Sequence, residues 1–349
     1  MDERDVRDRL RAVEDPALGD DIVSLGLVNE VDAGDERVAV DLGLGAPYSP
    51  AETAVAEEVR TTLAGADADV EVELSASVDR GADGDVMPGV KNVVAVASGK
   101  GGVGKSTVAV NVAAGLADRG ARVGLFDADV YGPNVPRMLG AEEPPRATEE
   151  ETLVPPERYG MKLMSMAFLV GEDDPVIWRG PMVHKVITQL WEDVEWGALD
   201  YMVIDLPPGT GDTQLTLLQS VPITGAAVVT TPQPVAVDDA RKGLEMFGTH
   251  DTPVLGVAEN MGTFRCPDCG GEHDVFGSGG GRELADEHQL PFLGSIPLDP
   301  SVRTGDESGR PVVLDEDSEV GERFREVTAE IADSVGIVAR RTHAGRVEA

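Results

Sequence analysis

The sequence predicts an α/β protein: a mostly parallel β-sheet covered by helices on both faces, preceded by a small α+β domain. Near-continuous apolar runs are typical of parallel strands that are buried on both faces. Five such runs lie at 93–97, 123–126, 201–204, 226–229 and 254–257. Helical segments separate them, as expected for helices that cover such a sheet. Before residue 79 the expected strands instead alternate apolar and polar residues, which places them in a different unit.

Residues 1–78 form the predicted small domain. Apolar residues at helical and alternating spacings predict two helices, at 2–13 and 51–63, and two strands, at 38–42 and 70–74. The next segment, 79–91, contains the glycine, aspartate and proline that are typical of a linker. The sheet domain is expected at 92–338, and residues 339–349 are expected to form a flexible tail.

The charge balance excludes some classes of partner. Acidic residues number 64 against 29 basic ones, and the formal net charge is −35. Nucleic acids and anionic membranes need clusters of Lys and Arg, so neither is an expected partner. The many negative charges repel one another. At 1 M salt the Debye length is about 3 Å, so dissolved ions would screen this repulsion. The acidity therefore indicates adaptation to a salt-loaded cytoplasm, as in a halophilic archaeon; the alternative is an ordinary acidic protein. A signal peptide and an 18-residue apolar run are both absent from the sequence.

A phosphate-binding loop is the clearest motif. Residues 99–106 read Gly-Lys-Gly-Gly-Val-Gly-Lys-Ser and fit G-x-x-x-x-G-K-[ST] between a strand and a helix. The glycines let backbone N–H groups face phosphate, and the helix N-terminus adds partial positive charge. Lys105 would reach the β- and γ-phosphates, and Ser106 would ligate Mg²⁺. We therefore expect a P-loop NTPase fold. The expected nucleotide-binding residues in the loop and directly after it are Gly99, Lys100, Gly101, Gly102, Val103, Gly104, Lys105, Ser106 and Thr107.

A second lysine distinguishes this loop from an ordinary phosphate loop. Lys100 lies close to Lys105 in a chain that has only six lysines. Two ammonium groups this close repel each other unless they face anionic phosphate. Lys100 is therefore predicted to reach across a dimer to the partner's nucleotide; the alternative is a solvated lysine.

Aspartates end two of the apolar runs. Asp127 and Asp129 follow one run, and Asp205 follows another. Ligands bind beyond the carboxyl ends of strands in open α/β sheets, so these side chains are expected near the phosphate loop. Asp205 suits the outer coordination sphere of Mg²⁺, and the N–H of Gly209 is placed to sense a γ-phosphate. Asp127 or Asp129 would orient the attacking water or the metal. The alternative for all three acids is helix capping. The candidate catalytic residues are Lys100, Lys105, Asp127, Asp129 and Asp205.

The two cysteines of the chain, Cys266 and Cys269, are separated by two residues. They supply two thiolates, whereas a structural zinc ion or an iron–sulfur cluster usually takes four ligands. Two chains could pool four thiolates around one cluster. Alternatively, His273 could help to complete a zinc site, the pair could be a redox dithiol, or both cysteines could be merely structural.

Together these motifs resemble the Mrp/ApbC/Nbp35 family of deviant Walker A ATPases, which carry iron–sulfur clusters. The resemblance covers about residues 90–338. It rests on the second lysine of the phosphate loop, the stretch at 127–136, the Asp-Leu-Pro-Pro-Gly-Thr-Gly-Asp stretch from Asp205, Asn260-Met261 and the Cys-Pro-x-Cys-Gly loop.

The first 78 residues resemble the small MIP18-type (DUF59) domain. Asp15-Pro16 and the segment at 22–28 carry this resemblance. That domain often has a cysteine in its central loop, which here reads Ala-Pro-Tyr-Ser-Pro at 46–50. The small domain is therefore not expected to supply a cluster ligand.

The family resemblance implies a homodimer that holds one [4Fe-4S] cluster between Cys266 and Cys269 of both chains. It implies binding of ATP with Mg²⁺, ATP hydrolysis, and release of the cluster to apo iron–sulfur proteins. It also assigns Lys100 to catalysis across the dimer and Asn260 to the adenine. On this resemblance we predict a cytoplasmic, ATP-dependent iron–sulfur cluster carrier.

Three other interpretations share the same nucleotide site. A regulatory switch resembling MinD and ParA would leave the cysteine pair unused or give it to a structural metal. An electron donor resembling the nitrogenase iron protein would have cysteines far apart in sequence. A zinc-stabilised regulatory ATPase would be separated from a cluster carrier by metal analysis.

Overall fold

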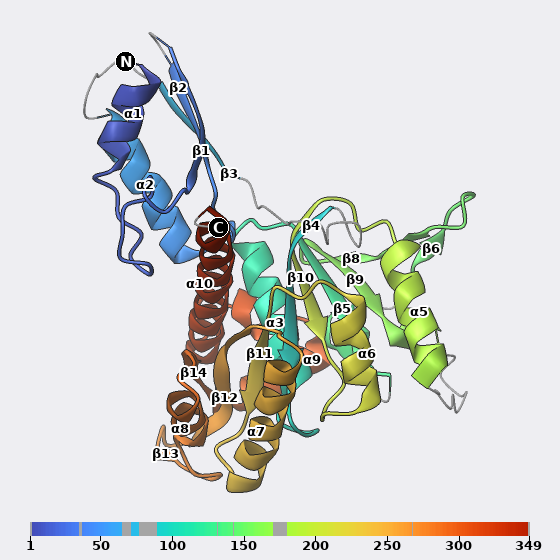
Figure 1. Ribbon diagram of the computed structural model, residues 1–349. Helices are drawn as coiled ribbons and strands as arrows, with labels where there is room; N and C mark the ends of the chain where they lie inside the picture. The colour runs from blue at the N-terminus through green and yellow to red at the C-terminus, as the bar shows by residue number, and fades with distance from the viewer. Residues whose placement is uncertain are drawn as a thin grey trace. The chain divides into compact units, whose positions relative to one another are not determined.

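The computed structural model describes residues 2–34, 37–64, 71–76, 89–130, 132–141, 143–169, 180–266 and 268–347. The chain divides into two compact units, one of residues 1–81 and 332–349 and one of residues 82–331 (Figure 1). Most of the expected linker, 79–88, lies outside the described residues.

The smaller unit packs two helices on a three-stranded sheet. The strands lie in the order β1 (Val28–Ala33), β2 (Arg37–Leu42) and β3 (Glu71–Ala76), with β1 antiparallel and β3 parallel to β2. The helices are α1 (Glu3–Leu10) and α2 (Pro50–Ala64). Their apolar stripes and the inner faces of the strands share one core. The expected helices and strands are confirmed here. Strand β1 was not predicted, because buried and exposed residues do not alternate along it.

The C-terminal helix differs from the expected flexible tail. Helix α10 (Glu319–Val347) continues through residues 339–347, and its last part, from Ala332, belongs to the smaller unit. The reason is Arg340, whose side chain is only 1% exposed. A guanidinium buried in this way must be paired, and the pairing holds the last turns of the helix in place.

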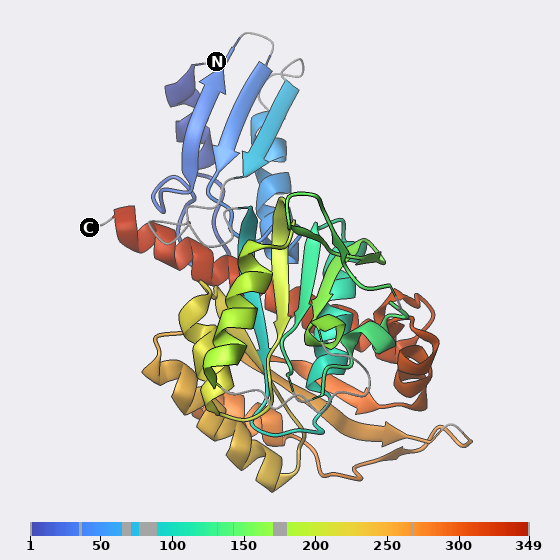
Figure 2. The ribbon, with the colours of Figure 1, turned by 90° about the vertical axis from the view of Figure 1, so that its right-hand side faces the viewer.

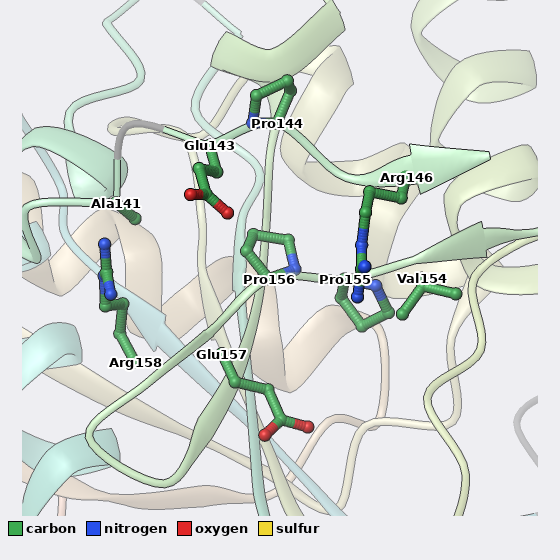
Figure 3. A pocket seen from close by; sticks show the side chains of 9 residues that line it. All are labelled: Ala141, Glu143, Pro144, Arg146, Val154, Pro155, Pro156, Glu157 and Arg158. Carbon is green, nitrogen blue, oxygen red and sulfur yellow. The ribbon is translucent and has the colours of Figure 1, made fainter.

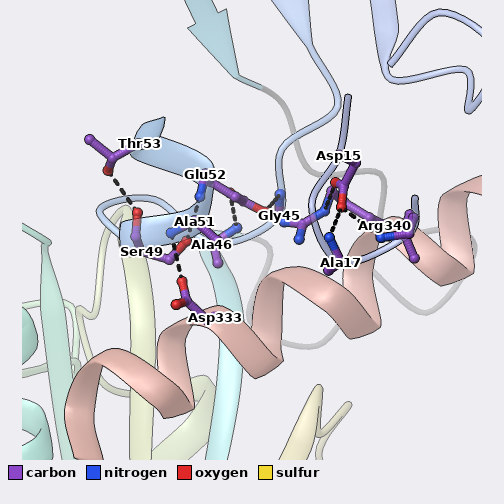
Figure 4. Close-up of polar contacts among 11 residues, drawn as sticks. Asp15, Ala17, Gly45, Ala46, Ser49, Ala51, Glu52, Thr53, Asp333 and Arg340 are labelled. Atoms are coloured by element: carbon purple, nitrogen blue, oxygen red, sulfur yellow. Dashed lines mark hydrogen bonds and ion pairs between the residues drawn. The ribbon is translucent and has the colours of Figure 1, made fainter. Parts of the chain in front are cut away.

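Two buried carboxylates pair with Arg340 (Figure 4). Its Nε lies 2.6 Å from Asp15 Oδ2, and its Nη1 lies 2.5 Å from Glu52 Oε1. Glu52 also accepts the backbone N–H groups of Gly45 and Ala46, at 3.0 and 2.7 Å. Burial raises the pKa of Glu52 despite the neighbouring guanidinium. The two carboxylates together satisfy the positive charge of the arginine.

The larger unit contains a nine-stranded, mostly parallel sheet. Its order is β13-β12-β11-β4-β10-β5-β9-β8, and β14 pairs with β12. Among the strands that the described residues form in this sheet, β8 and β13 alone pair antiparallel with their neighbours. All five expected strands are confirmed, whereas β9 and β14 were not predicted. The strands are β4 (Val90–Ala97), β5 (Val123–Asp127), β8 (Glu157–Arg158), β9 (Met161–Ser165), β10 (Leu199–Asp205), β11 (Gly225–Thr230), β12 (Val254–Arg265), β13 (Glu272–His273) and β14 (Phe292–Leu298).

Helices cover both faces of this sheet (Figures 1 and 2). One core joins the sheet to residues of α5–α8, among them Leu190, Leu217, Phe247 and Leu284. On α3, a Cβ at Gly115 would lie only 3.0 Å from the Thr328 hydroxyl of α10. The helices of this unit are α3 (Lys105–Asp118), α4 (Val135–Met138), α5 (Gly180–Glu192), α6 (Asp212–Ser220), α7 (Pro234–Thr249), α8 (Gly280–Glu287), α9 (Pro300–Ser308) and the first part of α10; a short hairpin joins β6 (Arg146–Ala147) to β7 (Leu153–Val154).

Replacing Arg340 by Ala should destabilise the smaller unit by about 3–5 kcal/mol, because the change leaves buried carboxylates without their cation. Hydrogen exchange of the α2 amides would measure the loss as a lower free energy of opening. The control is Arg341→Ala, since Arg341 is exposed on the same helix. Equal exchange in the two variants would show that the buried pairs do not hold the unit together.

Candidate functional site

The phosphate loop connects β4 to α3, as the sequence predicts. Gly102 and Gly104 adopt left-handed backbone angles, with φ of +82° and +83°. A Cβ at Gly104 would lie 2.1 Å from the side-chain nitrogen of Asn260, and one at Gly99 would lie 2.1 Å from the backbone of Asp239. Side chains are therefore excluded from both ends of the loop, and the backbone N–H groups are left free to turn toward a ligand.

The Lys105 ammonium contacts Oδ1 of Asp205 at the centre of the site. Lys105 is 6% exposed and Asp205 is fully buried. Burial raises the pKa of Asp205, while the Lys105 charge opposes the shift. The other carboxylate oxygen, Oδ2, is buried and accepts no hydrogen bond from the described residues. An anionic oxygen without a donor is a suitable partner for a bound cation or its water.

Three strand ends place the aspartates together. Asp205 on β10 is in register with Val96 on β4 and with Asp127 on β5. Asp127 Oδ2 accepts the Ser165 hydroxyl at 2.9 Å and the Val135 N–H at 3.2 Å. Burial, with the charge of Asp205, raises the pKa of Asp127 to about 7. The site therefore brings together more carboxylates than the Lys105 ammonium can neutralise.

The remaining predicted residues flank this centre. Asp129 is largely buried and accepts the Gly132 N–H at 3.2 Å, while its own N–H donates to Asp127. The N–H of Gly209 donates to the carbonyl of Ser98 at 2.9 Å. Lys100 is half-buried, and among the described residues no carboxylate lies within ion-pair distance of its ammonium. Lys100 is therefore a cation without an intrachain partner in the described part of the chain.

Strand β12 leads from the phosphate loop to the cysteines. The side-chain nitrogen of Asn260 donates to the carbonyl of Val103 at 2.8 Å. The preceding residue, Glu259, is 2% exposed, and its carboxylate accepts the backbone N–H groups of Gly279 and Gly281 at the start of α8. Met261 then takes a φ of +57°, and the pairing of β12 with β14 shifts register beyond this point. The strand is thus fixed beside the loop before it turns toward the thiols.

Both cysteines lie on the hairpin between β12 and β13. Cys266 is half-buried and Cys269 is exposed. The Cys266 N–H donates to the carbonyl of Gly271 at 2.9 Å, and the Gly270 N–H donates to the carbonyl of Cys266 at 2.8 Å, which closes a tight turn. Backbone N–H groups of Cys269 and Asp268, with the Cys269 thiol, lower the pKa of Cys266. These hydrogen bonds favour the thiolate, which is the form that binds metal.

A complete metal site does not form within the described residues. They contain no group of three or more His, Cys, Asp and Glu side chains that could hold an ion. His273 stands opposite Phe264 in the hairpin and is exposed. The described geometry therefore gives no support to a zinc site made of the two cysteines and His273 in one chain.

Two positioning residues escaped the sequence analysis. Ser165 holds Asp127 from β9, and Glu259 anchors β12 to α8. Ser165 ends β9, and Glu259 follows the apolar run at 254–257; a polar residue just after an apolar run is the signal that could have identified them.

A separate pocket of about 440 Å³ lies along the β6–β8 segment (Figure 3). Two arginines and two glutamates balance their charges there, and the pocket contains none of the predicted site residues. Its lining is Ala141, Glu143, Pro144, Arg146, Val154, Pro155, Pro156, Glu157 and Arg158.

Within the described residues, no helix combines the length and the apolar character that a membrane span requires.

Comparisons with protein families match both units. A family model described as NUBPL iron-transfer P-loop NTPase matches residues 89–332. A second model, described as iron-sulfur cluster assembly protein, matches residues 3–74. These matches bear out the resemblance that the sequence motifs carry.

Several similar proteins match most of the chain. The iron-sulfur cluster carrier protein of Deinococcus radiodurans is 46% identical over 94% of both chains. The iron-sulfur cluster transfer protein NUBPL of Dictyostelium discoideum is 45% identical over 72% of this chain and 79% of its own. A nucleotide-binding protein of Archaeoglobus fulgidus, solved with ADP, is 37% identical with a TM-score of 0.60, covering 69% of this chain and 94% of its own. The MinD ATPase of Pyrococcus furiosus, at 23% identity, TM-score 0.53 and coverage of 69% and 98%, shares the fold.

Asp127 should make the stability of the nucleotide-free chain depend on pH. Because its pKa is raised from 3.8 to about 7, the folded chain holds a proton that the unfolded chain releases in this interval. The contribution of Asp127 to the free energy of unfolding therefore falls as the pH rises through this window. Asp127→Asn removes this loss, so the variant should be more stable than wild type above pH 7, and the difference should shrink toward pH 4.

Urea unfolding followed by tryptophan fluorescence at several pH values measures this effect. Ser165→Ala is a second test, because it removes a donor that lowers the pKa of Asp127 and should extend the loss of stability to higher pH. Parallel profiles for wild type and Asp127→Asn would contradict the assigned protonation of Asp127.

Proposed function

Because this chain belongs to the NUBPL iron-transfer family of P-loop NTPases, we propose that it is an ATP-dependent carrier of iron–sulfur clusters. In this proposal two copies hold one [4Fe-4S] cluster between them, and ATP binding and hydrolysis govern its release to apo-proteins. The cluster is cargo, and the nucleotide drives its transfer.

The observation that carries the proposal is the path of β12. One strand places Asn260 against the phosphate loop and ends one residue before Cys266. The thiol pair is accessible, and hydrogen bonds lower the pKa of Cys266. An accessible pair of this kind suits reversible binding of a cluster better than permanent burial of a structural metal.

The ligand count supports a shared cluster. A [4Fe-4S] cluster takes four thiolates, and the chain has two cysteines. The described residues offer no third metal ligand beside them. A second copy of the chain would bring the missing pair, so we propose that the cluster bridges Cys266 and Cys269 of two protomers.

The nucleotide site supports phosphoryl transfer. We propose that Lys105 moves from Asp205 to the β- and γ-phosphates when ATP binds, and that Ser106 and Asp205 hold Mg²⁺. The uncompensated Oδ2 of Asp205 fits the outer coordination sphere of that ion. Asp127 or Asp129 orients the attacking water, and Lys100 of each copy reaches the nucleotide of the other.

Release of the cluster would follow from this geometry. In this proposal the phosphate loop moves when ATP binds and displaces the Val103 carbonyl, to which Asn260 donates a hydrogen bond. Strand β12 then carries this displacement toward Cys266. Such coupling requires that the cluster and the nucleotide each alter the binding of the other. A rate of hydrolysis and a nucleotide affinity that ignore cluster occupancy would contradict it.

The alternative of a MinD- or ParA-like switch is not favoured. Its structural relatives at about 20% identity show only the shared fold. The relatives that match across both units are cluster carriers, and the switch leaves the cysteine hairpin without a role.

Cluster loading tests the carrier function directly. After anaerobic reconstitution in molar KCl, which screens the high negative charge, the wild type should hold about four iron and four sulfide per dimer. Cys266→Ser and Cys269→Ser should each lose both, because each change removes two of the four thiolates in the dimer.

The control for this measurement is His273→Ala, which should keep full iron and sulfide. Stoichiometric zinc without sulfide, or iron that persists in Cys269→Ser, would reject the cluster and favour a switch with a structural metal.

Mixing two inactive variants tests whether Lys100 acts across the dimer. Lys105→Ala cannot bind its own phosphates productively but still offers Lys100, whereas Lys100→Ala offers an intact loop. Mixed dimers should therefore recover part of the ATP hydrolysis that each variant lacks alone. If mixing restores nothing although mixed dimers form, Lys100 serves its own chain.

A further inference from the structure

A contact outside the phosphate loop links the nucleotide site to helix α9. The hydroxyl of Thr107, the residue after Ser106, donates to Oδ2 of Asp306 at 3.3 Å. Thr107 is at the start of α3, beside the loop that would hold the phosphates. Asp306 therefore stands next to the phosphate cradle without being part of it.

Asp306 occupies the inward face of its helix. Along α9 only Val302, Gly305 and Asp306 are half-buried, at the i, i+3, i+4 spacing of one stripe, and the others are exposed. A carboxylate on the inward stripe of a surface helix needs donors to offset its loss of water. A role in solubility does not explain why the Asp306 carboxylate lies on this half-buried stripe.

The hydrogen bonds of Asp306 are incomplete. Among the described residues Thr107 is its one donor, and no cation lies within ion-pair distance of it. Burial raises the pKa of Asp306 to about 6, and the Thr107 hydroxyl only partly opposes this. A carboxylate accepts at two oxygens, so Oδ1 has capacity for a donor that a ligand would bring.

The chemistry of a nucleotide identifies that donor. Phosphate oxygens are acceptors and repel a carboxylate, so Asp306 is unsuited to bind them. The group joined directly to the α-phosphate is the ribose, which carries two hydroxyl donors. We propose that Asp306 is a ribose-binding residue: it accepts a ribose hydroxyl of the nucleotide held by the phosphate loop, and Thr107 orients it.

Two simpler roles for Asp306 make different predictions. If it only supported the start of α3, its loss would weaken the binding of every nucleotide alike. If it only repelled the phosphates, its loss would strengthen the binding of every nucleotide alike. A ribose-binding role alone changes the ratio between nucleotides that have and lack the hydroxyl.

The experiment compares the affinities of ADP, 2′-deoxy-ADP and 3′-deoxy-ADP with Mg²⁺ for the full, cluster-free chain in molar KCl. This inference rests on the nucleotide binding in the proposed function. Wild type should prefer ADP about tenfold over one of the two deoxy analogues, since a hydrogen bond to a charged group contributes at least that much. Asp306→Ala should lose about tenfold for ADP and little for that analogue. The matched control is Glu307→Gln, an exposed neighbour that pairs with Arg303, and it should behave as wild type.

An unchanged ratio of ADP to deoxy-ADP affinity in Asp306→Ala overturns the proposal, whether all affinities fall or rise together. Asp306→Asn preserves the shape and an uncharged acceptor, so an intermediate ratio is expected, and its thermal unfolding checks the fold. If the wild type binds ADP and both deoxy analogues with equal affinity, the ribose-binding role of Asp306 is rejected and the proposed function is not. A wild-type chain that binds no ADP rejects the proposed function with it.

Discussion

The buried contact between Lys105 and Asp205 is the interaction around which the nucleotide site is arranged. It places a cation from the start of α3 on a carboxylate at the end of β10, and both groups are almost fully out of water. Removing one partner of such a pair leaves an uncompensated buried charge, which costs about 3–5 kcal/mol. Asp127 and Asp129 add further carboxylates beside it, and burial, with the charge of Asp205, raises the pKa of Asp127. In the proposed function Mg²⁺ and the Lys100 of the partner supply the cations that an incoming triphosphate would otherwise lack.

Strand β12 connects the nucleotide site to the cysteine pair. Its first half is an interior strand of the parallel sheet, held between β11 and β14. Glu259 and Asn260 then fasten it on opposite sides, one to the start of α8 and the other to the phosphate loop. After the left-handed turn at Met261 the same strand becomes half of the cysteine hairpin. A strand that is held at the nucleotide site and leads directly to the thiols is a physical basis for the coupling we propose.

In the smaller unit, too, buried carboxylates lie next to a buried cation. The apolar core of this unit comes from its helices and strands, and the last turns of α10 contribute Arg340 to its interior. Two buried carboxylates, Asp15 and Glu52, share that single guanidinium, and burial raises the pKa of Glu52. In a chain with a net charge of −35, each cation that enters the interior is thus matched to acids that would otherwise repel one another.

The sequence alone determined the fold class and most of the candidate site, because these follow from local patterns. Apolar runs identify the parallel strands, and the glycine-lysine pattern at 99–106 identifies the phosphate loop by its own chemistry. The strand-end aspartates and the cysteine pair are likewise visible in the order of residues. Only the tertiary structure could show that Ser165 holds Asp127, that Asp306 meets Thr107, and that Arg340 is buried by the smaller unit. Those contacts join residues far apart in the chain, and whether a polar side chain is exposed or buried depends on the elements that fold against it.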